Sequence, residues 1–120
     1  MSNEPDSAAI IEECSGALIS AVNVAEIYSK TSDVGITSEE IDWAIDQLQI
    51  RPIVCDLDQA RVIGSLREPT RKFGLSLGHR ACLALGLTRD LPVITSDSQL
   101  AKPRISVDVR LFRRPATRKT

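Results

Sequence analysis

Three side chains able to do chemistry stand beside apolar segments of the chain. Glu26 follows the apolar run 17–20, Asp97 follows the run 92–95, and His79 begins a predicted helix between them. In open parallel sheets, ligands bind at the carboxyl ends of the strands, so we expect these side chains near one edge. Two carboxylates there can hold a hard divalent cation such as Mg²⁺, which can prepare a water molecule to attack a phosphodiester. Spacing alone is a weak signal, because acids at the ends of elements are common.

The elements that must position these residues are short apolar strands alternating with helices. We predict strands at residues 17–20, 52–55, 92–95 and 106–111, and helices at 22–29, 38–48, 58–69 and 78–87, with a weak helix at 6–13. Their N-caps are expected at Ser20 or Asn23, at Thr37 or Ser38, and at Asp58. This alternation predicts an α/β domain with a parallel sheet covered on both faces.

The composition is that of one globular domain of 120 residues, with 42% hydrophobic and 26% charged residues. The net charge of −1 gives no general attraction to nucleic acid, so only a local basic patch such as 110–119 could supply one. Three cysteines without C-x-x-C spacing indicate free thiols in a reducing compartment and no structural zinc. No apolar run approaches the ~20 residues that span a bilayer, and the acidic N-terminus is unlike a signal peptide. We therefore expect a cytoplasmic protein without a membrane partner.

Several blocks of the sequence, in order, resemble the PIN-domain family, which includes the VapC-type toxins. Residues 19–27 (Ile-Ser-Ala-Val-Asn-Val-Ala-Glu-Ile) resemble the stretch with the family's second metal-binding acid, here Glu26. Residues 74–85 resemble the next block, and 91–97 (Leu-Pro-Val-Ile-Thr-Ser-Asp) the block with the fourth acid, here Asp97. Residues 106–112 resemble the closing strand. The resemblance covers nearly all of the chain.

The resemblance implies a single PIN-like domain over residues 1–120, a three-layer α/β/α fold with a parallel sheet. It implies a Mg- or Mn-dependent endoribonuclease, usually the toxin of a toxin–antitoxin pair, with RNA as substrate. Family members commonly form homodimers and are silenced by a VapB-like antitoxin. Glu26 and Asp97 would be the catalytic and metal-binding residues, supported by Asn23, Thr95 and Ser96. Candidate RNA phosphate contacts are Arg80 and Arg110, for which salt bridges are the alternative.

The sequence departs from the family at two of the four acids. His79 stands where the family has its third aspartate, and an imidazole suits manganese or zinc better than magnesium. His79 is therefore either an altered metal ligand or a helix-start residue without a ligand role. The first aspartate is missing together with the central strand that carries it in the family. Asp6 is a poor substitute, because too few residues separate it from the run 17–20 for a parallel crossover.

The missing first strand would leave two apolar strand edges, at 17–20 and 92–95, without their common partner. These strands either close up on each other, receive a strand from another chain, or belong to a protein that starts further upstream. With two of four acids absent, we expect the ribonuclease to be weakened or inactive. The alternative is a non-catalytic PIN module that only dimerises or binds an antitoxin. Its expected contact surface includes Tyr28, Trp43 and the helix 38–48, which core packing would explain equally well.

One further motif is typical of serine hydrolases. Residues 74–78 (Gly-Leu-Ser-Leu-Gly) match the G-x-S-x-G pattern, with His79 and Asp97 nearby in sequence. The pattern requires a strand directly before the serine, whereas a helix is predicted before Ser76. His79 is also close in sequence to the serine, while the base of that fold comes from a separate loop. We therefore expect no serine hydrolase.

Overall fold

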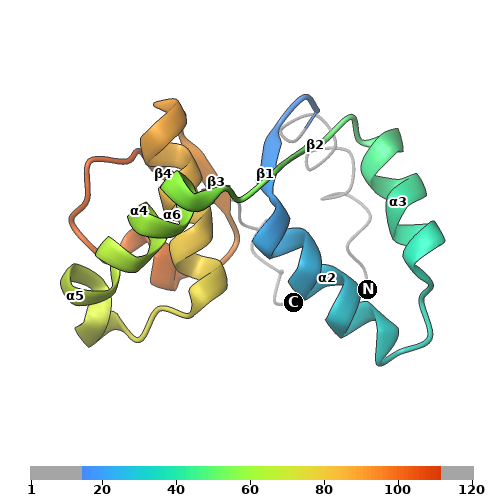
Figure 1. Cartoon of the computed structure of the whole chain (residues 1–120), viewed down its shortest axis with the longest axis horizontal. Coiled ribbons are helices and arrows are strands. Elements are labelled where there is room, and N and C mark those ends of the chain that lie inside the picture. Colours follow the sequence, from blue (N-terminus) through green and yellow to red (C-terminus); the bar gives the residue numbers. More distant parts are fainter. Residues whose placement is uncertain (1–14, 112–120) are drawn as a thin grey trace, which may run out of the picture.

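The structure is a computed structural model that describes residues 15–111 (Figure 1). It is a mixed α/β arrangement of helices and four short parallel strands. The helix expected at residues 6–13 lies outside the described part. The elements in chain order are β1 (Leu18–Ser20), α2 (Ala21–Ser32), α3 (Ser38–Gln47), β2 (Arg51–Ile53), α4 (Leu57–Ser65), α5 (Arg67–Thr70), the 3₁₀ helix η1 (Arg71–Phe73), α6 (Leu77–Arg89), β3 (Val93–Thr95), the 3₁₀ helix η2 (Ser98–Ala101) and β4 (Val109–Leu111).

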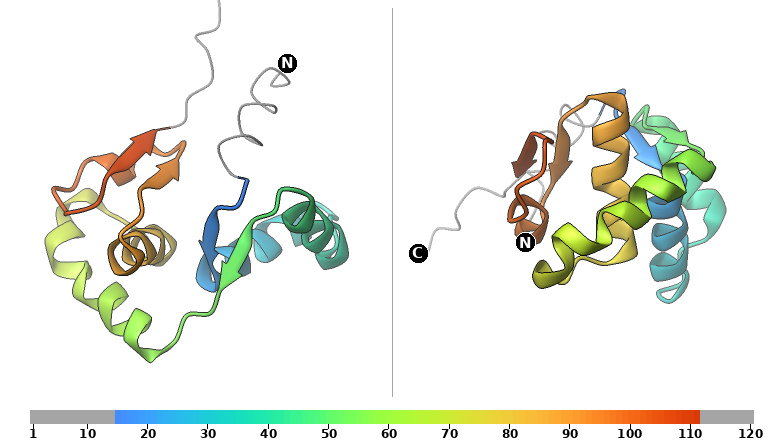
Figure 2. Two further views of the ribbon diagram at one scale, coloured as in Figure 1. Left: turned by 90° about the horizontal axis from the view of Figure 1, so that it is seen from above. Right: turned by 60° about the vertical axis from the view of Figure 1, so that its left-hand side comes forward.

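The strands form two separate parallel pairs rather than the one continuous sheet expected from the sequence. β1 pairs with β2, with Leu18 opposite Arg51, and β3 pairs with β4, with Val93 opposite Val109. Within residues 15–111 no pairing joins β1 to β3, and the two pairs stand apart in Figure 2. The sequence left three arrangements open for the edges of β1 and β3. The described residues do not adopt the first of these, direct pairing of β1 with β3. Pro52 lies in β2, an edge strand, where a missing N–H group is tolerated.

Each of the first two helices begins at one of the two caps that the sequence left open. Ser20 is the N-cap of α2, and its hydroxyl accepts a hydrogen bond of 3.1 Å from the Val22 N–H. Thr37 is the N-cap of α3 and forms a capping box with Glu40, in which each side chain accepts from the other's backbone N–H. These caps satisfy N–H groups that have no partner inside the helix, and thereby fix where each helix starts.

The third helical region differs from its expected form at both ends. Asp56, not Asp58, is the N-cap of α4, because its carboxylate accepts from the Gln59 N–H at 2.9 Å. The expectation of Asp58 was wrong by two residues, and Asp58 instead lies in the first turn. α4 ends at Ser65, and Pro69 lies inside the short helix α5 rather than ending the longer one.

The core is built around α6. Ala81, Leu83 and Ala84 on this helix are almost fully buried, and they form one cluster with Ile63 and Leu66 of the α4 region. α6 also contacts α2, β1 and β3, so it ties the two strand pairs together (Figure 2). Because one helix supports both pairs, the ends of β1 and β3 are held relative to the start of α6.

Helix α3 lies at the periphery. The apolar face that its sequence predicts, made by Ile41, Ala44, Ile45 and Leu48, is only half-buried, and Trp43 is 67% exposed. The Tyr28 hydroxyl of α2 donates to the Asp42 carboxylate of α3, which links the two helices. In the described residues, 15–111, no helix is long and apolar enough to cross a membrane.

Candidate functional site

The first turn of α6 carries a capping box with histidine in the third position. Ser76 is the N-cap, and its hydroxyl accepts from the His79 N–H at 3.2 Å. The Ser76 N–H donates to Nδ1 of His79 at 3.1 Å, and the Ser76 hydroxyl lies 3.1 Å from the same nitrogen. These bonds fix the imidazole at the start of the helix.

His79 also reaches Asp97, which follows β3. Nε2 of His79 lies 2.7 Å from Oδ2 of Asp97. Because the Ser76 backbone N–H can only donate, Nδ1 must accept, and the neutral ring then carries its proton on Nε2 and donates it to Asp97. Both nitrogens of His79 are thus engaged, one with its own helix cap and one with the carboxylate.

The Asp97 carboxylate is held by several donors. Its Oδ1 accepts from the Gln99 N–H at 2.9 Å as the N-cap of η2, and the Asp97 N–H donates to the Thr95 hydroxyl at 3.0 Å. The Gln99 N–H, followed by the His79 side chain, holds the pKa of Asp97 below its ordinary value, while burial acts in the opposite direction. Asp97 is therefore an anion near neutral pH, with free lone pairs on both oxygens.

Glu26 of α2 approaches the same turn of α6 from the other side. Its carboxylate lies against Gly78, where an added Cβ would come within 2.6 Å of the Glu26 Cδ atom. The Asn23 side chain, one turn earlier on α2, donates to the Gly78 carbonyl at 3.0 Å. Gly78 therefore lets the Glu26 carboxylate reach the N-terminal end of α6, where the helix dipole favours negative charge.

The structure thus brings the three expected residues, Glu26, His79 and Asp97, to one end of α6. Within residues 15–111 no three His, Cys, Asp or Glu side chains are close enough to form a metal site together. For His79 to bind a metal, it would have to give up the hydrogen bonding at one of its two ring nitrogens, to Ser76 or to Asp97. The available donors are two carboxylates, and Mg²⁺ is commonly held by one or two carboxylates with several waters retained.

The expected RNA contacts have different surroundings. Arg80 is buried, with 8% of its surface exposed, and its guanidinium donates to the Ile63 carbonyl at 3.1 Å. Its side chain therefore packs in the core and does not face a ligand. Arg110 is exposed on β4 and forms a salt bridge with Asp108 at 3.0 Å. Of these two arginines, Arg110 is the one accessible for a phosphate contact. Ser96, which was expected to support the acid site, is exposed beside Asp97.

Sequence reasoning missed two residues of this site. Ser76 was considered only as a nucleophile, although Ser-x-x-His has the spacing of a capping box. Gly78 was assigned no role, although it sets how closely the Glu26 carboxylate approaches α6. A glycine in the first turn of a helix was the available signal, because glycine is unfavourable there without a packing reason.

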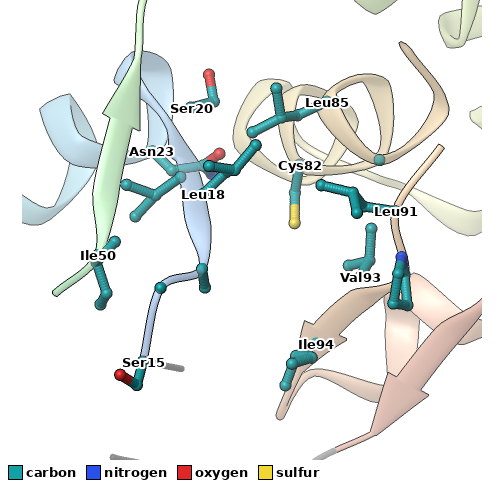
Figure 3. Close-up of a pocket in the computed structure, with 15 residues that line it drawn as sticks. Ser15, Leu18, Ser20, Asn23, Ile50, Cys82, Leu85, Leu91, Val93 and Ile94 are labelled. Carbon is teal, nitrogen blue, oxygen red and sulfur yellow. The ribbon is translucent and has the colours of Figure 1, made fainter. Parts of the chain in front are cut away.

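An apolar groove begins beside this site and runs between the two strand pairs (Figure 3). Its volume is about 490 Å³. Leu18 of β1 lies on one wall, Val93 and Ile94 of β3 on the other, and Cys82 of α6 at its base. Asn23, which bonds to the Gly78 carbonyl, also lines the groove, whereas Glu26 and Asp97 do not.

Comparison with models of protein families, with curated proteins and with solved structures gives no match to this chain.

Proposed function

We propose that this chain is a PIN-type, metal-dependent endoribonuclease of the VapC toxin class, with activity weakened by its incomplete set of acids. The observation that carries the proposal is that Glu26 lies against Gly78 while Asp97 bonds to His79, so both acids contact the first turn of α6. These residues come from three elements that are far apart in sequence. Two of them are the acids assigned by the resemblance.

The strand order supports the same proposal. β1 and β2 form one pair, β3 and β4 the other, and the groove lies between β1 and β3. A PIN-like three-layer sheet without its central first strand would have this order, with a gap at the position of the missing strand. The proposal therefore accounts for the separation of two strand pairs that share one supporting helix.

In the proposed site, Glu26 and Asp97 would hold the Mg or Mn ion through carboxylate oxygens, with water completing the coordination. Such an ion supplies an activated water and neutralises charge that develops on a phosphodiester. His79 keeps Asp97 oriented by donating Nε2–H to Oδ2, which is the support that ligating carboxylates commonly have. Asn23 holds α2 against α6, and Thr95 fixes the backbone of Asp97.

The proposal includes RNA as substrate, a homodimer and a VapB-like antitoxin as partners. Arg110 remains the accessible candidate for an RNA phosphate contact. Trp43 is a large exposed side chain on α3, and exposed aromatic residues are frequent anchors in protein interfaces. The non-catalytic module that only dimerises or binds an antitoxin is the alternative that the next experiment separates.

The test is a manganese titration of the full chain followed by an RNA cleavage assay. We expect cleavage that depends on Mn²⁺ and falls in Glu26→Gln by more than the roughly 10–100-fold that loss of an outer-shell partner costs, because Glu26 would bind the ion directly. Glu39→Gln changes an exposed acid in the first turn of α3 and should leave cleavage unchanged. His79→Asp restores the family's third acid and should raise it. Absence of cleavage in both the wild type and His79→Asp would leave only the non-catalytic module.

A second candidate rests on the hydrogen-bonded chain from Ser76 through His79 to Asp97, at 3.1 and 2.7 Å. A serine hydrolase uses such a chain to activate its nucleophile, and Ser76 is exposed. Against it, the element directly before Ser76 is the 3₁₀ helix η1 and not a strand, and the Glu26 carboxylate lies where N–H groups of α6 would have to stabilise an oxyanion. Labelling of Ser76 by a fluorophosphonate in excess EDTA would favour this candidate, and no labelling would remove it.

A further inference from the structure

The groove between β1 and β3 is bordered by two unpaired strand edges. β1 has β2 as its partner and β3 has β4, so in the described residues each has one edge without backbone hydrogen bonds. Unpaired N–H and C=O groups beside an apolar surface are costly, and such an edge is a ready template for another strand. Here two such edges flank the same space (Figure 3).

The described residues that line this groove are uncharged. Leu18 and Ile94 are only half-buried in the groove, and Leu91 at its rim is 45% exposed. Within residues 15–111 its lining includes no Asp, Glu, Lys, Arg or His, and its few polar side chains are neutral. A segment with charged side chains would lose its hydration here without gaining a partner. The occupant that complements this lining is therefore uncharged and largely apolar.

The volume of about 490 Å³ is within the range of small-molecule pockets. An apolar small molecule would cover Leu18 and Ile94, but it would leave the backbone groups of both edges without partners. An extended peptide would satisfy both requirements, since its backbone pairs with the edges and its side chains cover the apolar base. Main-chain pairing with side-chain pockets is how peptides add to exposed sheet edges.

We propose that this groove binds an uncharged, apolar segment of a second polypeptide, which adds as a strand between β1 and β3. The added strand would join the two pairs into one five-stranded sheet over α6. This inference does not depend on nuclease activity, because it rests on the strand edges and the groove lining alone.

The thiol of Cys82 reports whether the groove is filled, because it points into the groove from α6 (Figure 3). The experiment uses the full chain with Cys14→Ser and Cys55→Ser, so that one thiol remains. The probe is a capped hexapeptide of alternating valine and threonine. At about ten times its Kd, we expect the rate of Cys82 modification to fall about ten-fold, because only the unoccupied fraction reacts.

Two matched controls separate strand addition from other kinds of binding. The same peptide with alternate backbone amides N-methylated keeps its side chains but loses donors along one edge, and it should give no protection. Ile94→Lys places a charge in the groove and should abolish protection. Val54→Lys, at a side chain that is 75% exposed and outside the groove lining, should retain it. Melting curves of both variants establish that they fold.

Three results would overturn the proposal. Equal protection by both peptides would make the groove a site for apolar ligands in general. A thiol that is unreactive without peptide, in a monomer, would mean that the chain itself fills the groove. Protection that appears only as the protein dimerises would identify a second copy as the occupant.

Discussion

At the scale of the residue, His79 is held in place by hydrogen bonds to both of its ring nitrogens. Its Nδ1 is fixed by Ser76 and its Nε2 by Asp97, so its geometry favours orienting the carboxylate over binding an ion. The sequence alone left these two roles open, because the partners of an imidazole depend on how α6 and the end of β3 meet. The resemblance identified His79 as a candidate site residue, and the structure identifies Ser76 and Asp97 as its hydrogen-bond partners.

Cys82 allows a prediction about pH at the same scale. Burial raises the pKa of the Cys82 thiol above its ordinary value. In the Cys14→Ser, Cys55→Ser protein, the rate of thiol modification should therefore rise with pH at a midpoint above that of free cysteine, about 8.5. A midpoint at or below that of free cysteine would contradict the burial of this side chain.

The same shift has a consequence for stability. Because the folded pKa is raised, the neutral thiol contributes stability that is fully present below the unfolded pKa. That contribution is lost as the pH rises from the unfolded pKa through the folded one. Urea titrations at rising alkaline pH should show this loss in the wild type, relative to Cys82→Ala.

At the scale of the element, the caps decide where helices begin. The sequence left the cap of α3 open between Thr37 and Ser38, and the structure selects Thr37, which forms a capping box with Glu40. It did not predict the start of α4, because Asp56 and Asp58 are both good caps. The choice between them depends on the path of the chain from the end of β2 to the start of α4.

This difference can be measured with matched substitutions. Asp56→Ala removes the acceptor for the Gln59 N–H and should lower the free energy of unfolding by about 1 kcal/mol. Asp58→Ala removes only an exposed ion pair with Arg61, whose loss costs between about 0 and 1 kcal/mol. Urea denaturation of both variants gives the comparison. A larger loss for Asp58→Ala would place the cap where the sequence predicted it.

At the scale of the whole molecule, α6 holds together two strand pairs that do not meet. The sequence predicted the α/β class and four parallel strands, because the apolar runs are separated by helical segments with caps. It could not predict whether β1 and β3 would close together, since both are three-residue strands of similar apolar character. The separation follows from where α6 supports each pair, which no local pattern encodes.

The contact of α6 with β3 depends on Gly86. A Cβ there would lie 2.6 Å from Cγ2 of Val93 and 3.1 Å from the Leu91 carbonyl oxygen. Gly86→Ala should therefore lower the free energy of unfolding by about 1–3 kcal/mol, as overpacking does. Gly64→Ala on α4 meets nothing within 4 Å and should raise it by about 0.5–1 kcal/mol. Thermal or urea unfolding of both variants tests this, and a stabilised Gly86→Ala would show that the helix and strand do not pack closely.

The measurement that tests the account most directly is a titration of the full chain with Mn²⁺, followed by electron paramagnetic resonance of the free ion. We predict one bound Mn²⁺ per chain, with binding weakened in both Glu26→Gln and Asp97→Asn by more than the roughly 10–100-fold that loss of an outer-shell partner costs. Glu39→Gln, at an exposed position on α3, should bind Mn²⁺ as the wild type does. If all four proteins bind Mn²⁺ equally, or none binds it, Glu26 and Asp97 do not form a metal site.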